Sequence, residues 1–399
     1  MNKKHLQLFL LFLILFAFRS LSAAESILVI SDTHLTKETQ RHAAMMEAVI
    51  QAAKGKDLVL MTGDNTDNTR MEEHALVLQW AQIIEQQTGA KVYIIPGNHD
   101  YGAYFGPEQF IDSYEAYGWD LAFSRDTYTA SCAVMTSKGT CLLLLDSNRP
   151  DLDRSFLPDG RIEDSTLQWA RNVLESLPDG TPVIACGHHP ILPKDRDKRT
   201  PGAYSLSQLF RSYGVSLYLC GHDHGFATVE EDGLRQITIG QPQAYPGWAG
   251  CVEIEEDAFL WHVEQIYEEH SSAYIHLQEN AYNLSRDMAR GTLKSTPYAD
   301  DEDAITWFSE VFMLSLNGNM TSDAQDQLLS DNNYQKWRQV ETKTVVKDWI
   351  LNLLEHPTDL KELYIPSPGK HAQSLKKAPP VWTTPDGIRC YVLRLRSQK

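Results

Sequence analysis

The sequence is poor in cysteine and in positive charge, and each shortage excludes a class of protein. It has six cysteines among 399 residues. No two of them stand in the C-x-x-C spacing of a thiolate metal site or a redox motif. Lys and Arg number 36 against 53 Asp and Glu, which gives a formal net charge of −17. A surface of that sign repels nucleic-acid backbones, so the charge argues against a nucleic-acid partner.

The cysteines also do not form the framework of a small disulfide-rich protein. Cys141, Cys186 and Cys220 lie in apolar runs and are predicted to be small buried hydrophobic residues. Cys132 and Cys141 can face each other across a hairpin, and an exported protein permits a bond between them. The sequence leaves both the bonded and the free state of this pair open.

Long apolar runs are absent except at the N-terminus. There Lys3 and Lys4 precede an apolar run at 6–18, and small residues end at Ala24. This order predicts a secretory signal cleaved after Ala24, so the mature protein is expected to be secreted or extracytoplasmic, without a transmembrane span. The alternative is a membrane anchor, although the run is short for a span of ~20 residues and Arg19 interrupts it. Cleavage would remove three basic residues and no acid, which changes the net charge from −17 to −20.

The next part of the chain alternates strand and helix patterns. Its apolar runs have strand length and end in Gly, Pro, Ser, Thr or Asp, as in a sheet buried on both faces. This order predicts parallel strands joined by right-handed crossovers, with ligands beyond the carboxyl ends of the strands. The predicted strands are 27–31, 57–62, 91–96, 141–146, 182–187 and 215–221, and the predicted helices are about 40–54, 72–87, 165–177 and 204–213.

Longer helical patterns begin near residue 268. Ile305, Phe308 and Phe312 fit one helical face, and Val346 and Ile350 fit another. The helices could cap the site, bind a partner or mediate oligomerisation.

The last 30 residues carry seven Lys or Arg and one acid, typical of a solvated tail or of a segment that binds a polyanionic surface. The predicted parts are a signal peptide at 1–24, a first domain at 25–267, a helical domain at 268–360 and an irregular basic tail at 361–399.

Polar motifs follow the ends of most predicted strands. Because such ends meet at one edge of a sheet, groups about 190 positions apart in sequence are expected to come together. Imidazole, carboxylate and amide donors without thiolate suit Zn²⁺, Mn²⁺ or Fe better than Ca²⁺ or Cu(I). Together the imidazole, carboxylate and amide groups of these motifs can hold two metal ions side by side. The motifs are Asp32-Thr33-His34, Gly63-Asp64, Gly97-Asn98-His99-Asp100, Gly187-His188-His189 and Gly221-His222-Asp223-His224.

Over about residues 26–265 the chain resembles the calcineurin-like metallophosphoesterase superfamily. The motifs match, in order, its pattern D-x-H, G-D, G-N-H-D/E, G-H and G-H-x-H. Looser matches at 144–146, 167–169 and 240–243 resemble the branch with class III cyclic-nucleotide phosphodiesterases and purple acid phosphatases. The resemblance implies a two-sheet α/β sandwich with a smaller C-terminal helical domain, and it makes 25–267 the catalytic domain.

The resemblance also implies hydrolysis of a small phosphomonoester or phosphodiester. A hydroxide held between two metals would attack phosphorus in line. His99 would protonate the leaving alkoxide, and Asp100 would orient His99. The first metal would be bound by Asp32, His34 and His224, the second by Asn98, His188 and His222, and Asp64 would bridge the two.

One position departs from the purple acid phosphatases, which carry an iron-binding tyrosine three positions after the bridging aspartate. Asp67 stands there, and 65–71 contains no tyrosine. A ferric tyrosinate site is therefore not expected, and the metals stay open among Zn, Mn and Fe.

Two other functions remain as alternatives. A binding module with this fold but without turnover typically loses ligands or the acid, whereas this chain keeps the complete set. A nuclease is the second alternative, against which the acidic charge counts.

Several further side chains have two interpretations. Tyr101, Tyr104 and Phe105 could line a leaving-group pocket or pack under their loop, and His189 could contact phosphate or only hold its turn. Histidines outside the motifs are expected to be structural or exposed. The core of the helical domain is predicted to include Trp307, Trp337 and Trp349.

Overall fold

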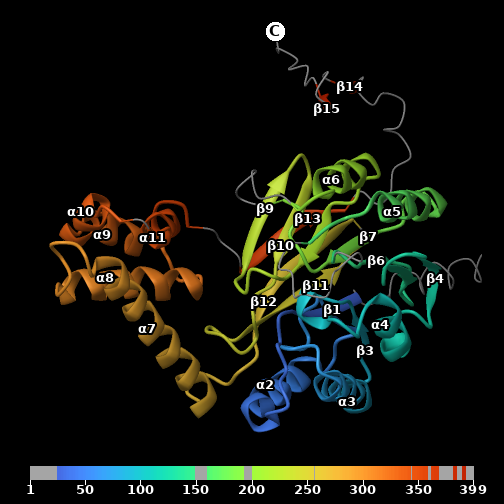
Figure 1. Ribbon diagram of the computed structural model, residues 1–399, viewed down its shortest axis with the longest axis horizontal. Coiled ribbons are helices and arrows are strands. Elements are labelled where there is room, and N and C mark those ends of the chain that lie inside the picture. The colour runs from blue at the N-terminus through green and yellow to red at the C-terminus, as the bar shows by residue number, and fades with distance from the viewer. Residues whose placement is uncertain are drawn as a thin grey trace, which may run out of the picture.

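The computed structural model describes residues 25–148, 160–192, 200–255, 257–342, 344–357, 361–367, 381–383 and 389–391. Within these residues the chain forms an α/β body with two large sheets, followed by a group of helices (Figure 1). This confirms the predicted two-sheet α/β sandwich with a helical C-terminal part.

The first sheet has six strands in the order β13-β12-β11-β1-β2-β3. β1, β2 and β3 are parallel, whereas β11, β12 and β13 extend the sheet with antiparallel pairing. Helices α2 and α3 connect the parallel strands and lie on the outer side of this sheet (Figure 1). The elements are β1 Glu25–Ile30, α2 Thr39–Ala52, β2 Leu58–Met61, α3 Met71–Thr88, β3 Lys91–Ile94, β11 Trp248–Ile254, β12 Ala258–Gln265 and β13 Glu362–Pro366.

The second sheet has seven strands in the order β4-β5-β6-β7-β8-β10-β9. Its centre, from β6 to β10, is parallel, and both edges pair antiparallel. Its elements and neighbouring helices are α4 Pro107–Tyr114, β4 Ala122–Arg125, β5 Cys132–Met135, β6 Cys141–Leu145, α5 Asp164–Ser176, β7 Val183–Gly187, α6 Ala203–Ser212, β8 Leu217–Cys220, β9 Ala227–Glu231 and β10 Leu234–Thr238.

Strand β6 shows why the central runs are apolar throughout. Leu142 and Leu144 belong to the core shared with the first sheet, whereas Leu143 and Leu145 pack in a separate core with α5 and α6. Successive side chains of a strand point to opposite faces, so a strand covered on both faces must be apolar at every position. The sandwich thus buries the strands and leaves their loops to carry polar groups.

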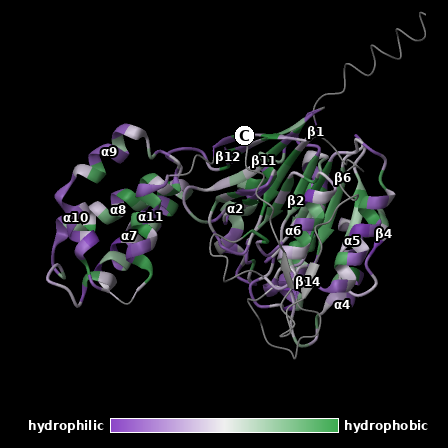
Figure 2. Cartoon of the chain, turned by 90° about the horizontal axis from the view of Figure 1, so that it is seen from above, coloured by the Kyte–Doolittle hydropathy of each residue, from purple (hydrophilic) through white to green (hydrophobic). Residues whose placement is uncertain are grey.

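The C-terminal helices form a unit with its own core, seen beside the α/β body in Figure 2. Trp307, Phe308, Trp337 and Ile350 are buried in it, as the helical periodicity predicts. Trp349 is 38% exposed, so its predicted place in the core is wrong. The helical unit consists of α7 Ser272–Leu293, α8 Glu302–Leu316, α9 Ser322–Ser330, α10 Asn332–Gln339 and α11 Val346–Glu355. The domain boundaries themselves stay a prediction.

The segment expected to be an irregular tail begins instead with a strand. β13 pairs with β12 and returns the chain from the helical unit to the first sheet. The exposure of its side chains alternates, but its five residues include a consecutive apolar run at 363–365, so the sequence carries no clear strand pattern. A small hairpin follows, β14 Val381–Thr383 and β15 Arg389–Tyr391, and the rest of the basic tail lies outside the described residues.

The register of β5 and β6 decides the state of the predicted cysteine pair. Cys132 pairs with Leu144 and Cys141 pairs with Met135, so the two thiols stand at opposite ends of the ladder. Both are free and buried. The bonded alternative is therefore wrong.

The predicted signal peptide, residues 1–24, lies outside the described residues. Among the helices that the structure describes, none combines the length and the apolar character that a membrane crossing requires.

Candidate metal centre

The backbone at the strand ends has an uncommon conformation. Asp32, His34, Asp64, His222 and His224 all have φ between 42° and 74°. Residues with a Cβ rarely adopt this left-handed region, at a cost of about 1–3 kcal/mol each, and such residues cluster at functional sites. The tight turns aim these side chains back at one another over the edge of the two sheets.

Glycine at a neighbouring strand end permits the close approach of these turns. A Cβ added at Gly97 would lie 2.2 Å from both the backbone N and the Oδ1 of Asp64. Only glycine lets the loop after β3 pass this close to the loop after β2.

One group of predicted ligands comes from the loops after β1, β2 and β8. His34 Nε2 lies 3.1 Å from His224 Nε2. His224 Nε2 lies 3.5 Å from Asp32 Oδ1, and His34 Nε2 lies 3.8 Å from Asp64 Oδ2. Ligand atoms of all four residues lie within 4.8 Å of one another, so together they can hold one metal ion.

The remaining predicted ligands lie on the other side of Asp64. His188 Nε2 is 3.2 Å from Asp64 Oδ2, and His222 Nδ1 is 3.2 Å from Asn98 Oδ1. His188 donates its Nδ1–H to the Thr62 carbonyl at 3.0 Å. That hydrogen bond leaves Nε2 as the nitrogen that faces the site. Asp64 Oδ2 therefore stands between the two groups, where a bridging carboxylate would be.

His189 lies with His188 and His222 in a further set of ligand atoms within 4.8 Å. Its Nδ1 is 2.9 Å from the Ser147 hydroxyl, and its backbone N–H donates to the same hydroxyl at 3.0 Å. These bonds hold the turn after β7. A contact of His189 with phosphate stays a prediction.

The charges at the centre fit a cation. Asp32 and Asp64 are both buried. Burial raises the pKa of Asp32 to about 7, with the charge of Asp64 acting in the same direction and His188 opposing both. The burial of Asp64 by itself would raise its pKa. The neighbouring His188, His99 and His34 have the larger effect, so the pKa of Asp64 lies below its usual range. Two carboxylates so close together in a buried site need positive charge beside them.

The histidines favour the neutral form that binds metal. Burial lowers the pKa of His34 and of His222 to about 4, and it also lowers the pKa of His224. His188 is the exception, because Asp64 raises its pKa to about 9 against the effect of burial. Neutral imidazoles beside carboxylates and an amide oxygen suit a transition metal, so the residues present fit the predicted ions.

The predicted proton donor is oriented differently from expectation. His99 donates its Nδ1–H to the carbonyl oxygen of Asp67 at 2.8 Å, and its Nε2 lies 3.9 Å from Asp64 Oδ2. A backbone carbonyl thus makes the orienting bond that was assigned to the Asp100 carboxylate.

Asp100 instead ties the loop after β2 to the loop after β3 under the site. Its carboxylate accepts hydrogen bonds from the backbone N–H groups of Asn65 at 3.1 Å, Thr66 at 2.8 Å and Gly97 at 2.8 Å. The Asn65 amide and the Thr66 hydroxyl donate to it as well. Asp100 therefore acts on the shape of the centre through the backbone.

Two residues at the site were missed by sequence reasoning. Asp67 Oδ1 lies 3.3 Å from His34 Nδ1, and Gln243 donates to the carbonyls of the turn after β1. At position 67 the sequence pattern indicates only that the tyrosine of the purple acid phosphatases is missing. The motif match at 240–243 held the signal for Gln243, but nothing in it showed what the side chain contacts.

The aromatic residues after His99 mostly pack under their loop. Tyr101 and Phe105 are buried in the main core, and Tyr101 donates its hydroxyl to buried Asp146 at 2.7 Å. Tyr104 is 91% exposed.

Outside this centre, Cys251, His262 and Glu264 also bring ligand atoms within 4.8 Å. The Lys56 ammonium lies 2.7 Å from Glu264 and 3.3 Å from Cys251. A cation of the chain itself thus already occupies this cluster.

A family model and several known proteins resemble the chain in sequence. Residues 25–226 match the family model described as calcineurin-like phosphoesterase. The chain belongs to this family. Members of the family that it resembles are phosphate-ester hydrolases, and the predicted resemblance is confirmed.

Among its relatives is the Arcobacter nitrofigilis protein named "Probable glycerophosphodiester phosphodiesterase GpdQ". The two are 27% identical over 229 residues, or 53% of this chain and 77% of the relative. Human tartrate-resistant acid phosphatase type 5 is 23% identical over 47% of this chain and 61% of its own length. A solved purple acid phosphatase, PPD1 from yellow lupin, aligns with a TM-score of 0.42 at 12% identity, over 61% of this chain and 52% of its own.

Proposed function

We propose that this chain is an exported phosphoesterase that uses two metal ions to hydrolyse small phosphomonoesters or phosphodiesters. The observation that carries the proposal is the convergence of carboxylate, imidazole and amide groups on both sides of Asp64. Loops far apart in sequence supply these groups, and strained backbone holds most of them.

Seven residues would hold the ions. Bound metal ions neutralise charge on phosphoryl oxygens and lower the pKa of a bound water towards ~7. Asp64 faces both groups with Oδ2 and would be shared between the ions. Asp32, His34 and His224 would complete the first site, and Asn98, His188 and His222 the second.

His99 is the group best placed to hold a proton for the leaving alkoxide. Its Nδ1–H is engaged by the Asp67 carbonyl, so its Nε2 faces the centre beside Asp64. The His99 backbone N–H donates to Asp64 Oδ1 at 2.8 Å. The Asp67 carbonyl thus fixes the ring, and Asp64 fixes the backbone that carries it, relative to the carboxylate that would be shared.

The relatives support both classes of ester as substrates. One is named a glycerophosphodiester phosphodiesterase and another an acid phosphatase. The leaving-group side of the site is the part of the structure that must distinguish them, since the groups around Asp64 would bind the phosphoryl group common to both.

The test is an activity panel on the mature chain, stripped of metal and then reloaded with Zn²⁺, Mn²⁺ or Fe. It should compare aryl monoesters, aryl diesters, cyclic nucleotides, nucleotides and glycerophosphodiesters. We expect turnover that requires added metal, with two ions bound per chain. Fewer than two ions and no hydrolysis would favour a binding module. Digestion of single- or double-stranded DNA in preference to the small esters would favour a nuclease.

Export rests on the sequence of the first 24 residues. Cleavage after Ala24 would leave Glu25, the first residue of β1, as the new N-terminus. Mass spectrometry of the protein recovered from the producing cell is expected to show a chain that begins at Glu25. An intact N-terminus in the membrane fraction would instead establish the anchored form.

A further inference from the structure

The loop between β10 and β11 contacts the turn that carries the first two predicted ligands. The Gln243 side-chain amide donates to the carbonyl oxygen of Asp32 at 2.9 Å and to that of Thr33 at 3.2 Å. The Oε1 of Gln243 is buried and has no hydrogen-bond partner among the described residues. Both donor hydrogens of this amide are thus committed to one turn.

That turn needs support from outside itself. Asp32 and His34 have φ of 54° and 42°, a conformation that costs about 1–3 kcal/mol for each residue with a side chain. The loop after β2 binds the turn on one side, where Asp32 N–H donates to Gly63 O and His34 N–H donates to Asp64 O, both at 3.0 Å. Gln243 binds the carbonyls between these two amides and so holds the turn from the other side.

The loop that carries Gln243 is anchored in the helical unit. Tyr245 is buried in the helical core, and its hydroxyl accepts a hydrogen bond from Asn317 Nδ2 at 3.0 Å. Its ring lies 6.0 Å from that of Tyr274 on α7. Gln243, which contacts the metal centre, and Tyr245, which contacts the helices, are thus only two positions apart in sequence.

A second contact path runs parallel to the first. Phe226 follows the ligand turn of β8, and its ring packs edge-on against Trp248 at 5.8 Å. On its other side Trp248 reaches the turn after α8, where a Cβ added at Gly318 would lie 3.4 Å from its ring. The helical unit is therefore connected to the loops of the metal centre by two paths, directly through Tyr245 and indirectly through Trp248.

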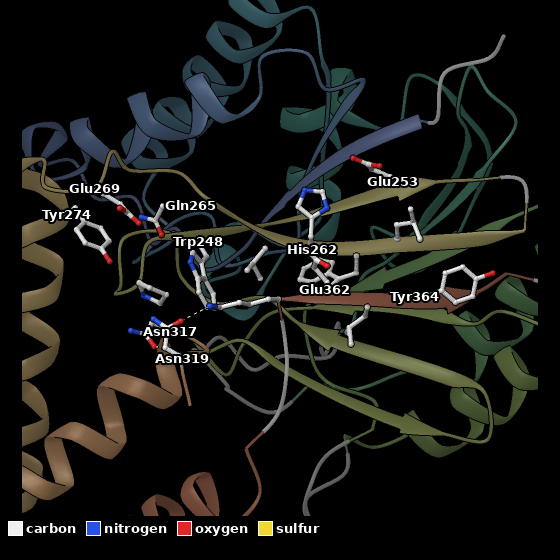
Figure 3. A pocket seen from close by; sticks show the side chains of 16 residues that line it. Trp248, Glu253, His262, Gln265, Glu269, Tyr274, Asn317, Asn319, Glu362 and Tyr364 are labelled. Carbon is white, nitrogen blue, oxygen red and sulfur yellow. Dashed lines mark hydrogen bonds between the residues drawn. The ribbon is translucent and has the colours of Figure 1, made fainter. Parts of the chain in front are cut away.

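A cavity of about 920 Å³ lies beside these contacts (Figure 3). Trp248, Tyr274 and Asn317 line it from the sheet and from the helices. Side chains of the sheet and of the helices face each other across this cavity, so the removal of one contact beside it is expected to have a measurable effect.

We propose that Gln243 is a positioning residue of the metal centre and that the helical unit holds it in place through Tyr245. This inference rests on the proposed function, since it concerns the same ligands. The helical unit thereby has a role in shaping the site. Its contacts with the loop hold Gln243, Gln243 holds the carbonyls of Asp32 and Thr33, and these carbonyls set the directions of the Asp32 and His34 side chains.

The first test compares Gln243→Ala and Gln243→Glu with the control Gln325→Ala. Gln325 also donates its side-chain amide to a backbone carbonyl, that of Leu354 at 2.8 Å, but it joins α9 to α11 and does not line the junction cavity. Calorimetric titration of metal-free protein with Mn²⁺ is expected to show about 10- to 100-fold weaker binding for both Gln243 variants, the usual effect of losing a group that orients a ligand. The control should bind like the wild type.

The thermal unfolding of the metal-free proteins separates positioning from general stability. A positioning role predicts weaker Mn²⁺ binding in Gln243→Ala with an unfolding temperature close to that of Gln325→Ala. Mn²⁺ affinity within twofold of the wild type would overturn the inference while leaving the proposed function intact. A wild-type chain that binds neither Mn²⁺ nor Zn²⁺ would overturn the proposed function and this inference together.

The second test addresses the helical unit. Tyr245→Phe removes the hydroxyl that binds Asn317 but keeps the ring, and Tyr282→Phe makes the same change on α7 away from the junction. Tyr245→Phe is expected to weaken Mn²⁺ binding in the same direction as Gln243→Ala, by a few-fold, and Tyr282→Phe to leave it unchanged. Equal affinities for the two variants would overturn the part assigned to the helices.

Discussion

The carboxylate of Asp67 lies against the ring of His34, with Oδ1 3.3 Å from Nδ1. His34 presents its other nitrogen, Nε2, to Asp64 and His224. A carboxylate on the far nitrogen of a metal-binding imidazole fixes the tautomer and the direction of the ring. Asp67 Oδ1 and His34 Nδ1 lie within ion-pair distance but make no hydrogen bond. We therefore expect Asp67, which stands where a tyrosinate site would need a tyrosine, to orient His34 through its charge.

Replacement of Asp67 by alanine is therefore expected to weaken metal binding by about 10- to 100-fold. The backbone carbonyl that holds His99 is retained in this variant, so the effect should come through His34. The affinity of the metal-free protein for Mn²⁺, measured by calorimetry, checks this. Asp348→Ala, an exposed aspartate on α11, is the control. Equal affinities for the two variants would show that His34 needs no such partner.

Asp64 should be more sensitive than any residue around it. Its Oδ2 faces His34 on one side and His188 on the other, so Asp64→Ala is expected to remove a ligand from both metals. The loss of turnover should exceed the ~100-fold that follows the loss of an outer partner. Metal content by elemental analysis and turnover of an aryl phosphate are the measurements. A variant with two metals and full turnover would show that the bridging assignment is wrong.

The sequence predicted the parallel part of the fold well for a physical reason. Strands such as β6 and β7 are buried on both faces, so each appears as a continuous apolar run that ends in a turn residue. The antiparallel strands at the edges carry no such run. No residue of β9 is fully buried, and exposure alternates along β4. Strands of this kind are recognised by their packing partners rather than by a run of apolar residues.

The candidate site was predictable in its residue types but not in its contacts. The spacing of Asp32 and His34 indicates ligands at a strand end, yet the partner of Gln243 lies about 210 positions away in sequence. The orientation of His99 depends on a backbone carbonyl. Every residue has such a carbonyl, so a sequence pattern cannot indicate which one is the partner. Contacts of this kind appear only when the loops are placed in three dimensions.

The main effect of replacing Asp100 is expected to be a loss of folding stability. Asp100→Ala would leave the backbone N–H groups of Asn65, Thr66 and Gly97 buried without an acceptor. An unsatisfied buried donor costs about 1–3 kcal/mol, so the free energy of unfolding should fall by at least about 3 kcal/mol. Urea unfolding of the metal-free protein measures this. Asp112→Ala, at an exposed position of α4, should stay within about 0.5 kcal/mol. A similar small change for Asp100→Ala would mean that water replaces the carboxylate.

His74 should make the protein less stable in mild acid. It is buried on α3, stacks on Phe105 at 3.8 Å, and its Nδ1 lies 2.8 Å from the hydroxyl of Tyr114. Burial lowers its pKa from 6.5 to about 4. Between these values the unfolded chain binds a proton that the folded chain does not, so the free energy of unfolding falls as the pH drops from about 6.5 to about 4. The full difference is about 3 kcal/mol.

A His74→Phe variant separates this contribution from the acids of the site. Phenylalanine can keep the stack on Phe105 and cannot take up a proton, whereas the lost bond to Tyr114 lowers stability equally at every pH. Urea unfolding at pH 7 and pH 4 should therefore show a loss of stability on acidification that is smaller in the variant than in the wild type by about 3 kcal/mol. His276→Gln, at an exposed position of α7, should follow the wild type. Parallel profiles for wild type and His74→Phe would mean that the buried imidazole accepts a proton without opening its pocket.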